Sequence, residues 1–382
     1  MSRFIRLVSA FVSLSLSLSL FAAPPAPPPQ NVIVDVDMDF DDILALAFLG
    51  NDPGVKINLV TIDSVGWVHC APGLVNVAEE FRQLNLGEPR TECGRPHTLP
   101  GGHSDRVPLD WRENADNFFG LKSSYSAHAL NATLSGRAGK PLPLFQQPLL
   151  GQVESRAIEA MIEVLKSANT PVTIISLSTL TNISDLFDAL VNQRELADKI
   201  GGIYMMGGAF LPHKGNVEPY ISGNEWAEWN MYIDPEAAQN VLKNPLGINL
   251  VQVPLNITDA VPITRHFTEG LKQLEKKTPA VQLAVRLFDK NPWLAAEKGL
   301  YFWDSLTAML ALQPGQAEYW RNQAVTVETG DNNNAGRLTR NAGGTVTIGH
   351  TLNIPEGYKD FDDWLISLLN RGATGEARVL NY

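Results

Sequence analysis

The chain has 382 residues, 44% hydrophobic and 19% charged, which is typical of a globular protein with a sizeable core and excludes a disordered chain. The formal net charge of −11 argues against a nucleic-acid partner, because binding a polyanion requires a basic surface. Cys70 and Cys93 do not have the spacing of a cysteine metal site. They can form a disulfide in an oxidising compartment, although the sequence leaves the distance between them open.

The first 23 residues have the layout of a secretory signal peptide. Arg3 and Arg6 precede an apolar, serine-rich stretch that ends in alanines at positions 22–23. Serines interrupt this stretch too often for a membrane span, so an uncleaved anchor is the less favoured interpretation. Residues 24–30 are rich in proline and predict a short, stiff linker. We therefore expect a secreted, extracellular protein that does not associate with membranes.

Five aspartates follow the first predicted strand. Residues 32–34 are apolar and β-branched, and the apolar residues within 43–48 recur at helical spacing. The acids between them lie at a strand-to-helix turn, on the sheet edge where α/β proteins bind ligands: Asp35, Asp37, Asp39, Asp41 and Asp42. Helix capping explains Asp41 or Asp42 but not all five, since unpaired like charges raise one another's pKa and cost stability. A bound Ca²⁺ or Mg²⁺, which prefers oxygen ligands, explains the whole group.

Strand-like and helix-like segments alternate along the rest of the chain. Apolar β-type runs lie at 32–34, 57–62, 172–175, 203–206 and 248–253, and helical patterns at 73–84, 153–167, 235–242, 279–288 and 303–312. This order predicts a single α/β domain over residues 31–382, with an open, mostly parallel, Rossmann-like sheet and helices on both faces. Residues 93–147 are interpreted as a long surface loop beside the ligand-binding edge. A β-hairpin of residues 324–329 and 344–348 around a turn at 331–334, then a helix at 358–369, close the domain.

The run Asp35-Val-Asp37-Met-Asp-Phe-Asp41-Asp42, with its flanking strand and helix, resembles the signature of the nucleoside hydrolases. The inosine-uridine preferring enzymes are the best known members of that family, and the resemblance covers nearly all of the mature chain. It implies the nucleoside hydrolase fold, with Asp37 and Asp42 as ligands of a Ca²⁺ ion and Asp41 bonded to a ribose hydroxyl. The family's usual Pro-Gly in this turn is Met38-Asp39 here, which leaves the geometry of the turn open.

A second motif, Leu177-Ser-Thr-Leu-Thr-Asn182, follows the predicted strand at 172–175. It is similar to the family's strand-end loop, in which a backbone carbonyl binds the calcium. The resemblance gives this role to the carbonyl of Leu177, which needs backbone geometry and no particular side chain. Asn182 is then expected to brace a buried helix start.

A third motif, Glu228-Trp-Asn230, is similar to the family's Glu-aromatic-Asn block. The resemblance implies that Glu228 binds the ribose 5′-hydroxyl and that Asn230 binds other sugar hydroxyls. Upstream, the segment Gly215-Asn216-Val-Glu-Pro resembles a block whose Asn also reaches the 5′ side. Compared with the spacing in the family, six extra residues lie between this segment and Glu228. Asn224, which is nearer to Glu228, is therefore a second candidate for that role.

The fourth motif contains Trp303 and Asp304. Asp304 is similar to the family's distant calcium ligand, which also meets the sugar. Many members carry a histidine just before this aspartate, proposed as the acid that protonates the leaving base. An indole has no titratable proton at neutral pH but can stack on a base, so Trp303 leaves the proton donor open. His69 and His97 lie in loops near the expected site, although a lone histidine is more often structural.

The resemblance implies calcium-dependent hydrolysis of the N-glycosidic bond of ribonucleosides, with Asp37 as the base that activates a water held by the ion. The alternative is a catalytically silent, secreted nucleoside-binding protein that keeps the calcium site. Two other aspartate motifs fail on spacing: an EF-hand loop needs glycine where Phe40 stands, and a haloacid dehalogenase needs Thr or Val where Asp39 stands. The partner is expected to be a small nucleoside. A homo-oligomer fits the family, but the base preference stays open.

Overall fold

The computed structural model describes residues 28–122, 155–218, 221, 223–296, 298–330 and 332–372. The predicted signal peptide at 1–23 and most of the predicted linker lie outside these ranges. Within them, no helix combines the length and the apolar character needed to cross a membrane.

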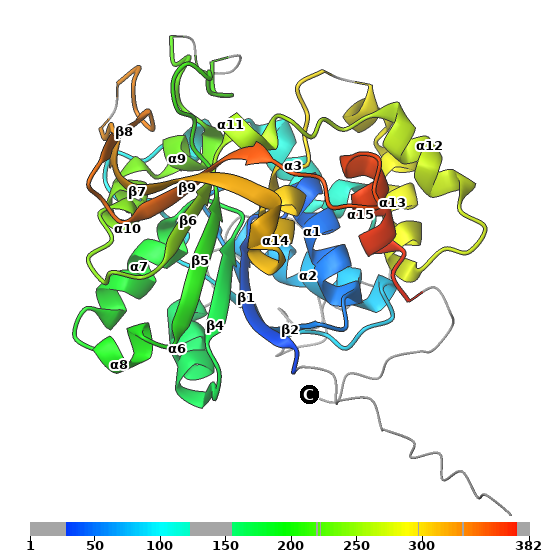
Figure 1. Ribbon diagram of the computed structural model, residues 1–382, viewed down its shortest axis with the longest axis horizontal. Coiled ribbons are helices and arrows are strands. Elements are labelled where there is room, and N and C mark those ends of the chain that lie inside the picture. The colour runs from blue at the N-terminus through cyan, green and yellow to red at the C-terminus, as the bar shows by residue number, and fades with distance from the viewer. Residues whose placement is uncertain are drawn as a thin grey trace, which may run out of the picture.

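A nine-stranded sheet runs through the centre of the domain in the order β3-β2-β1-β4-β5-β6-β9-β7-β8 (Figure 1). Neighbours pair in parallel from β3 to β9, whereas β7 pairs antiparallel with both β9 and β8. The strands are β1 (Gln30–Val36), β2 (Val55–Ile62), β3 (Thr91–Cys93), β4 (Val172–Ser176), β5 (Ile200–Met206), β6 (Leu250–Val253), β7 (Ala317–Val327), β8 (Leu338–Ala342) and β9 (Val346–Leu352). This confirms the prediction of an open, mostly parallel sheet.

Helices cover both faces of the sheet, as predicted (Figure 1). They are α1 (Phe40–Asn51), α2 (Cys70–Gln83), α3 (Leu109–Asp116), α6 (Ala157–Ser167), α7 (Thr181–Leu190), α8 (Arg194–Ala197), α9 (Trp229–Ile233), α10 (Pro235–Leu242), α11 (Leu255–Thr258), α12 (Arg265–Gln273), α13 (Pro279–Lys290), α14 (Trp303–Leu312) and α15 (Phe361–Leu369). One apolar core joins the sheet to α1, α2, α13, α14 and α15, and the other joins it to α6, α7 and α10. Burial of these two apolar layers is the main force that holds the domain together.

The C-terminal hairpin differs from the prediction in its second strand. Residues 323–327 of β7 pair with β8 (Leu338–Ala342), whereas residues 346–348 pair with the earlier part of β7, residues 320–323. Those residues begin β9, which lies between β7 and β6 in the sheet. The sequence does not predict β8, because this edge strand is largely exposed and polar and therefore has no apolar run.

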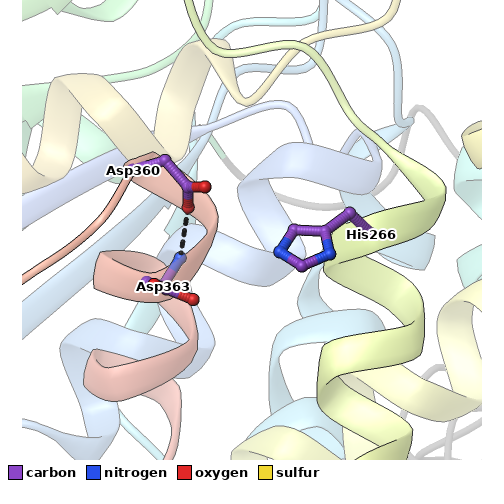
Figure 2. A group of neighbouring side chains, drawn as sticks. All are labelled: His266, Asp360 and Asp363. Carbon is purple, nitrogen blue, oxygen red and sulfur yellow. Dashed lines mark hydrogen bonds between the residues drawn. The ribbon is translucent and has the colours of Figure 1, made fainter.

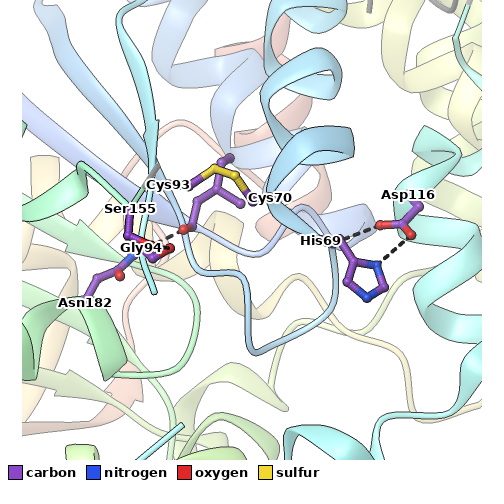
Figure 3. Close-up of a disulfide and its surroundings, with 8 residues drawn as sticks. His69, Cys70, Cys93, Gly94, Asp116, Ser155 and Asn182 are labelled. Atoms are coloured by element: carbon purple, nitrogen blue, oxygen red, sulfur yellow. Dashed lines mark hydrogen bonds and ion pairs between the residues drawn. A yellow bond between two sulfur atoms is a disulfide. The ribbon is translucent and has the colours of Figure 1, made fainter. Parts of the chain in front are cut away.

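A disulfide joins Cys70, the first residue of α2, to Cys93 at the end of β3, with their Cα atoms 5.7 Å apart (Figure 3). The next residue, Gly94, lies against Asn182 so closely that an added Cβ would overlap its amide. The structure thus answers the question of pairing that the sequence left open. It also places the disulfide beside the sheet edge where β1, β2 and β4 end.

Candidate active site

The turn after β1 buries the aspartates that the sequence singles out. Met38 adopts a left-handed backbone with φ of 58°, a conformation that costs energy for a residue other than glycine and recurs at functional sites. Asp39 is the N-cap of α1, since its Oδ1 accepts from the amide of Phe40 at 2.7 Å. Its own amide donates to Oδ2 of Asp42 at 3.0 Å. Capping therefore explains Asp39, which is the N-cap residue, and also Asp42, whose side chain completes a capping box, as the sequence suggested for Asp42.

The remaining acids form a buried cluster. Burial is the largest effect on Asp37, Asp42 and Asp304, and together with the charges of neighbouring aspartates it raises the pKa of each carboxyl well above the ordinary value. Burial also raises the pKa of Asp41 to about 7. Oδ2 of Asp37 and Oδ1 of Asp42 have no hydrogen-bond donor among the residues that the structure describes. Buried carboxylate oxygens that lack donors fit a hard cation such as Ca²⁺.

The other two predicted metal ligands, Leu177 and Asp304, are distant in the sequence but lie close to the turn after β1. The amide of Asp304, at the start of α14, donates to Oδ2 of Asp41 at 3.2 Å. The amide of Leu177 donates to the carbonyl of Asp35 at 2.8 Å, which continues the pairing of β4 with β1. The structure thus brings the carbonyl of Leu177 and the carboxyl of Asp304 to the ends of β1 and α1.

Asp35 is a support for this edge. Its carboxyl accepts from Thr61 at 2.6 Å, from Asn182 at 2.8 Å and from Ser178 at 3.0 Å, so it ties β1 to β2, α7 and the loop after β4. Burial raises its pKa to about 6, and these donors oppose the rise. Asn182 is buried and bonded, which confirms its predicted bracing role.

The Glu-Trp-Asn block lies next to the predicted ligand Leu177. Glu228 caps α9, and its carboxylate accepts from the amides of Gly208 and Asn230, both at 2.9 Å. Burial is the main cause that raises the pKa of Glu228 to about 7. The side-chain amide of Asn230 donates to the carbonyl of Leu177 at 3.2 Å. Asn230, a predicted sugar-binding residue, is therefore in contact with Leu177, a predicted metal ligand.

The two rival asparagines have different surroundings. Oδ1 of Asn216 accepts from the amide of Trp229 at 2.9 Å, directly beside Glu228, and the residue is half-buried. Asn224 is buried and donates to the carbonyl of Ala335 at 2.9 Å. Asn216 is therefore adjacent to the Glu-Trp-Asn block, whereas the bond of Asn224 fixes a loop.

Trp303 lies on one side of the acid cluster. Its ring is 6.1 Å from that of Phe40 and 5.5 Å from that of Tyr301, measured between centroids. Its indole N–H donates to Oδ1 of Asp259 at 2.9 Å. The ring therefore has a fixed orientation, and its N–H is already engaged.

A second aromatic group is formed by Trp67, Trp111 and Trp229. Trp67 stacks on Trp111 at 4.5 Å and lies 5.8 Å from Trp229. The preceding Gly66 abuts the acid cluster, since an added Cβ would overlap Oδ2 of Asp37. Arg112 of α3 holds the loop by donating to the carbonyls of Trp67 and Val65. No sequence motif indicates Arg112, because its role depends on contacts with a segment some 45 residues away.

A separate group of potential metal ligands lies between α12 and α15, formed by His266, Asp360 and Asp363 (Figure 2). Their ligand atoms all lie within 4.8 Å of one another. The carboxylates of Asp37, Asp42 and Asp304 do not all lie within this distance of one another. Asp360, however, caps α15 by accepting from the amide of Asp363 at 3.0 Å. Since His266 is also exposed, helix capping accounts for this group and we assign no ion to it.

The chain is similar to known proteins over much of its length. The profile of the inosine-uridine preferring nucleoside hydrolases matches residues 32–361. The pyrimidine-specific ribonucleoside hydrolase RihA of Photobacterium profundum is 32% identical over 154 residues, which are 40% of this chain and 45% of that protein. The match to such curated relatives thus spans less than half of their length.

Two solved structures share the fold. A plant nucleoside hydrolase aligns with a TM-score of 0.66 and 22% identity, covering 91% of this chain and 100% of that one. The inosine-uridine preferring nucleoside hydrolase of Bacillus anthracis aligns with a TM-score of 0.65 and 21% identity, covering 89% and 99%. Because the family profile matches most of the chain, the protein belongs to the inosine-uridine preferring nucleoside hydrolase family.

Proposed function

We propose that the chain hydrolyses the N-glycosidic bond of ribonucleosides to free base and ribose, and that this activity requires Ca²⁺. The observation that carries the proposal is the buried cluster of Asp37, Asp42 and Asp304, in which one oxygen of Asp37 and one of Asp42 lack hydrogen-bond donors among the described residues. A chain of this family with that acid cluster has the carboxylates needed to bind the ion and to activate a water for hydrolysis of the N-glycosidic bond.

Asp37, Asp42, Asp304 and the carbonyl of Leu177 would hold the ion. When bound, Ca²⁺ supplies a Lewis acid that orients the attacking water and the ribose 2′- and 3′-hydroxyls. Asp37 accepts a proton from that water as its oxygen bonds to the anomeric carbon and the bond to the base breaks.

The sugar residues serve binding and charge stabilisation. Glu228 and Asn216 meet the 5′ side, while Asn230 and Asp41 meet the other hydroxyls. Positive charge develops on the sugar as the glycosidic bond breaks, so the surrounding carboxylates lower the barrier. Trp303 provides an aromatic surface on which a nucleobase can stack.

A nucleoside-binding protein without catalysis is the second candidate. Trp303 favours it, because its engaged N–H supplies no acid for the leaving base. The donorless oxygen of Asp37 favours the enzyme, since a binder has no need of a base that activates water.

Release of ribose from inosine, adenosine, guanosine, uridine and cytidine tests the proposal, with the mature chain assayed with and without a calcium chelator. We expect turnover that the chelator abolishes and added calcium restores. Absence of turnover, together with a calcium-dependent rise in thermal stability on adding nucleoside, would establish the binder instead.

We also propose that the protein is secreted. The predicted signal peptide at 1–23 supports this, and so does the disulfide between Cys70 and Cys93, because disulfides persist in oxidising compartments. Expression of the full chain should yield protein in the medium that lacks residues 1–23 on N-terminal sequencing. Cell-associated protein that retains these residues would contradict secretion.

A further inference from the structure

His69 and Asp116 form a pair beside the proposed active site (Figure 3). Nδ1 of His69 lies 2.8 Å from Oδ2 of Asp116, and the amide of His69 donates to Oδ1 of the same carboxyl at 2.8 Å. Because a carboxylate accepts, Nδ1 carries a proton, and any proton that His69 transfers is the one on Nε2. Asp116 thus fixes the orientation of the ring.

The second ring nitrogen is available to a ligand. In the described parts of the chain, no residue bonds Nε2 of His69. Figure 3 shows this nitrogen directed away from Asp116 and from α2. The His69 side chain is 35% exposed, whereas that of Asp116 is 8% exposed. A buried carboxylate behind a half-exposed imidazole is an arrangement suited to proton transfer.

The loop that carries His69 also contacts the acid cluster. The amide of Val68 donates to the carbonyl of Asp37 at 3.0 Å, one residue before His69. The charged groups that face the pair come from α3 and the segment after it. Arg112 is one of them, and its guanidinium interacts electrostatically with the carboxylates of both Asp116 and Asp37. Lys122 is the other, since its ammonium donates to the carbonyl of Asp116.

Four other histidines in the described ranges, His103, His213, His266 and His350, are poorly placed for this role. His213 has both ring nitrogens engaged, Nδ1 with the carbonyl of Lys214 at 2.7 Å and Nε2 facing Asp259 at 3.4 Å. His103 is buried and stacked on Tyr232. His266 and His350 lie on α12 and β9, away from the ends of β1 and β4.

We propose that His69 is the proton donor to the leaving nucleobase, with Asp116 as its positioning residue. This rests on the proposed hydrolase function. As the bond between the anomeric carbon and the base nitrogen breaks, its electron pair stays on the base and Nε2 of His69 gives the base a proton. The water oxygen bonds to the anomeric carbon, and Asp37 takes the proton of that water. The products are ribose and protonated base, after which His69 regains a proton from solvent and Asp37 releases one.

The test compares two leaving groups. A nucleoside that the wild-type chain hydrolyses needs a proton on its base, whereas p-nitrophenyl riboside releases a stable phenolate without one. H69Q is expected to lower kcat on the nucleoside roughly 10²- to 10³-fold but to change kcat on the p-nitrophenyl riboside less than about threefold. D116N should show the same selectivity with a smaller loss. The exposed His266→Gln serves as the control and should match wild type on both substrates.

The retained activity on the activated riboside also shows that H69Q is folded. Equal losses on both substrates would overturn the inference, because they would mean that the substitution displaces Asp37. Unchanged nucleoside turnover would overturn it as well. A wild-type chain that hydrolyses neither substrate in the presence of calcium would overturn the proposed function itself, and this inference with it.

Discussion

Gly66 shows how closely the neighbouring loop packs on the proposed catalytic carboxyl. A Cβ at this position would overlap Oδ2 of Asp37 and lie 2.9 Å from its Cβ. Gly66→Ala should therefore displace the Asp37 side chain and lower both calcium affinity and ribose release by roughly tenfold or more, since a 1 Å misplacement can cost up to 10²-fold. Gly315→Ala is the matched control, because a Cβ there meets nothing within 4 Å. Equal behaviour of the two variants in calcium titration and turnover would contradict the assignment.

The choice between Asn216 and Asn224 can be made with one pair of substrates. We expect Asn216→Ala to raise KM for a nucleoside roughly tenfold and to have a much smaller effect on its 5′-deoxy analogue, because only the first offers the 5′-hydroxyl. Asn224→Ala should instead lower thermal stability, since it removes a bond to the buried carbonyl of Ala335. Steady-state kinetics on both substrates and thermal unfolding of both variants provide the check. A 5′-hydroxyl effect in Asn224→Ala alone would reverse the roles.

At the scale of elements, the disulfide fastens α2 to β3 across 23 residues. Closing a loop of this length restricts the unfolded chain, which corresponds to about 3 kcal/mol of stability in the chain-entropy account. Replacing both Cys70 and Cys93 with alanine should lower the free energy of unfolding by roughly this amount in denaturant titration. Exposed serines such as Ser167 provide a control when replaced with alanine. A double variant as stable as wild type would show that α2 and β3 need no covalent link.

Helices and strands are predictable where their buried residues form a regular apolar pattern in the sequence. The strands β1, β4 and β5 are almost wholly buried, so their apolar runs were recognised. The exposed edge strand β8 and the polar helix α3 carry no such pattern, so the sequence does not predict them. Spacing indicates Asp42 as a capping acid of α1, which the capping box confirms, but it does not single out Asp39 as the N-cap residue.

The candidate site was predictable where its residues lie in local motifs at strand ends. Asp37, Leu177 and Glu228 each follow a recognisable strand or precede a helix, and the structure brings their segments together. Asp116 and Asp259 were not predicted, since each acts on a partner more than 40 residues away, His69 and Trp303 respectively. Such contacts depend on the tertiary fold and leave no trace in residue spacing.

At the scale of the whole molecule, the acid cluster links stability to pH. The pKa of Asp41 rises from 3.8 to about 7 on folding, and the pKa values of Asp37, Asp42 and Asp304 rise as well. Between about pH 4 and pH 7 the folded chain therefore holds protons that the unfolded chain has released, so the free energy of unfolding falls as pH rises. In chelator, Tm should decline from about pH 5 to about pH 8.

Calcium should reverse this decline, because it binds the deprotonated carboxylates. Scans of Tm at both pH values, with chelator and with excess calcium, should show a larger gain from calcium at the higher pH. The exposed acid replacement Asp188→Asn should leave the pattern unchanged. A gain from calcium that does not vary with pH would mean that the ion binds elsewhere.

The central claim is that Asp37 and a calcium ion act together on the water that attacks a ribonucleoside. The most direct measurement is ribose release by wild type and Asp37→Asn, assayed in parallel while calcium is titrated back into chelated protein. We predict that wild-type turnover rises with calcium to saturation, and that Asp37→Asn stays roughly 10²- to 10⁴-fold slower even at saturating calcium. Full activity of Asp37→Asn, or wild-type turnover that needs no calcium, would contradict the account.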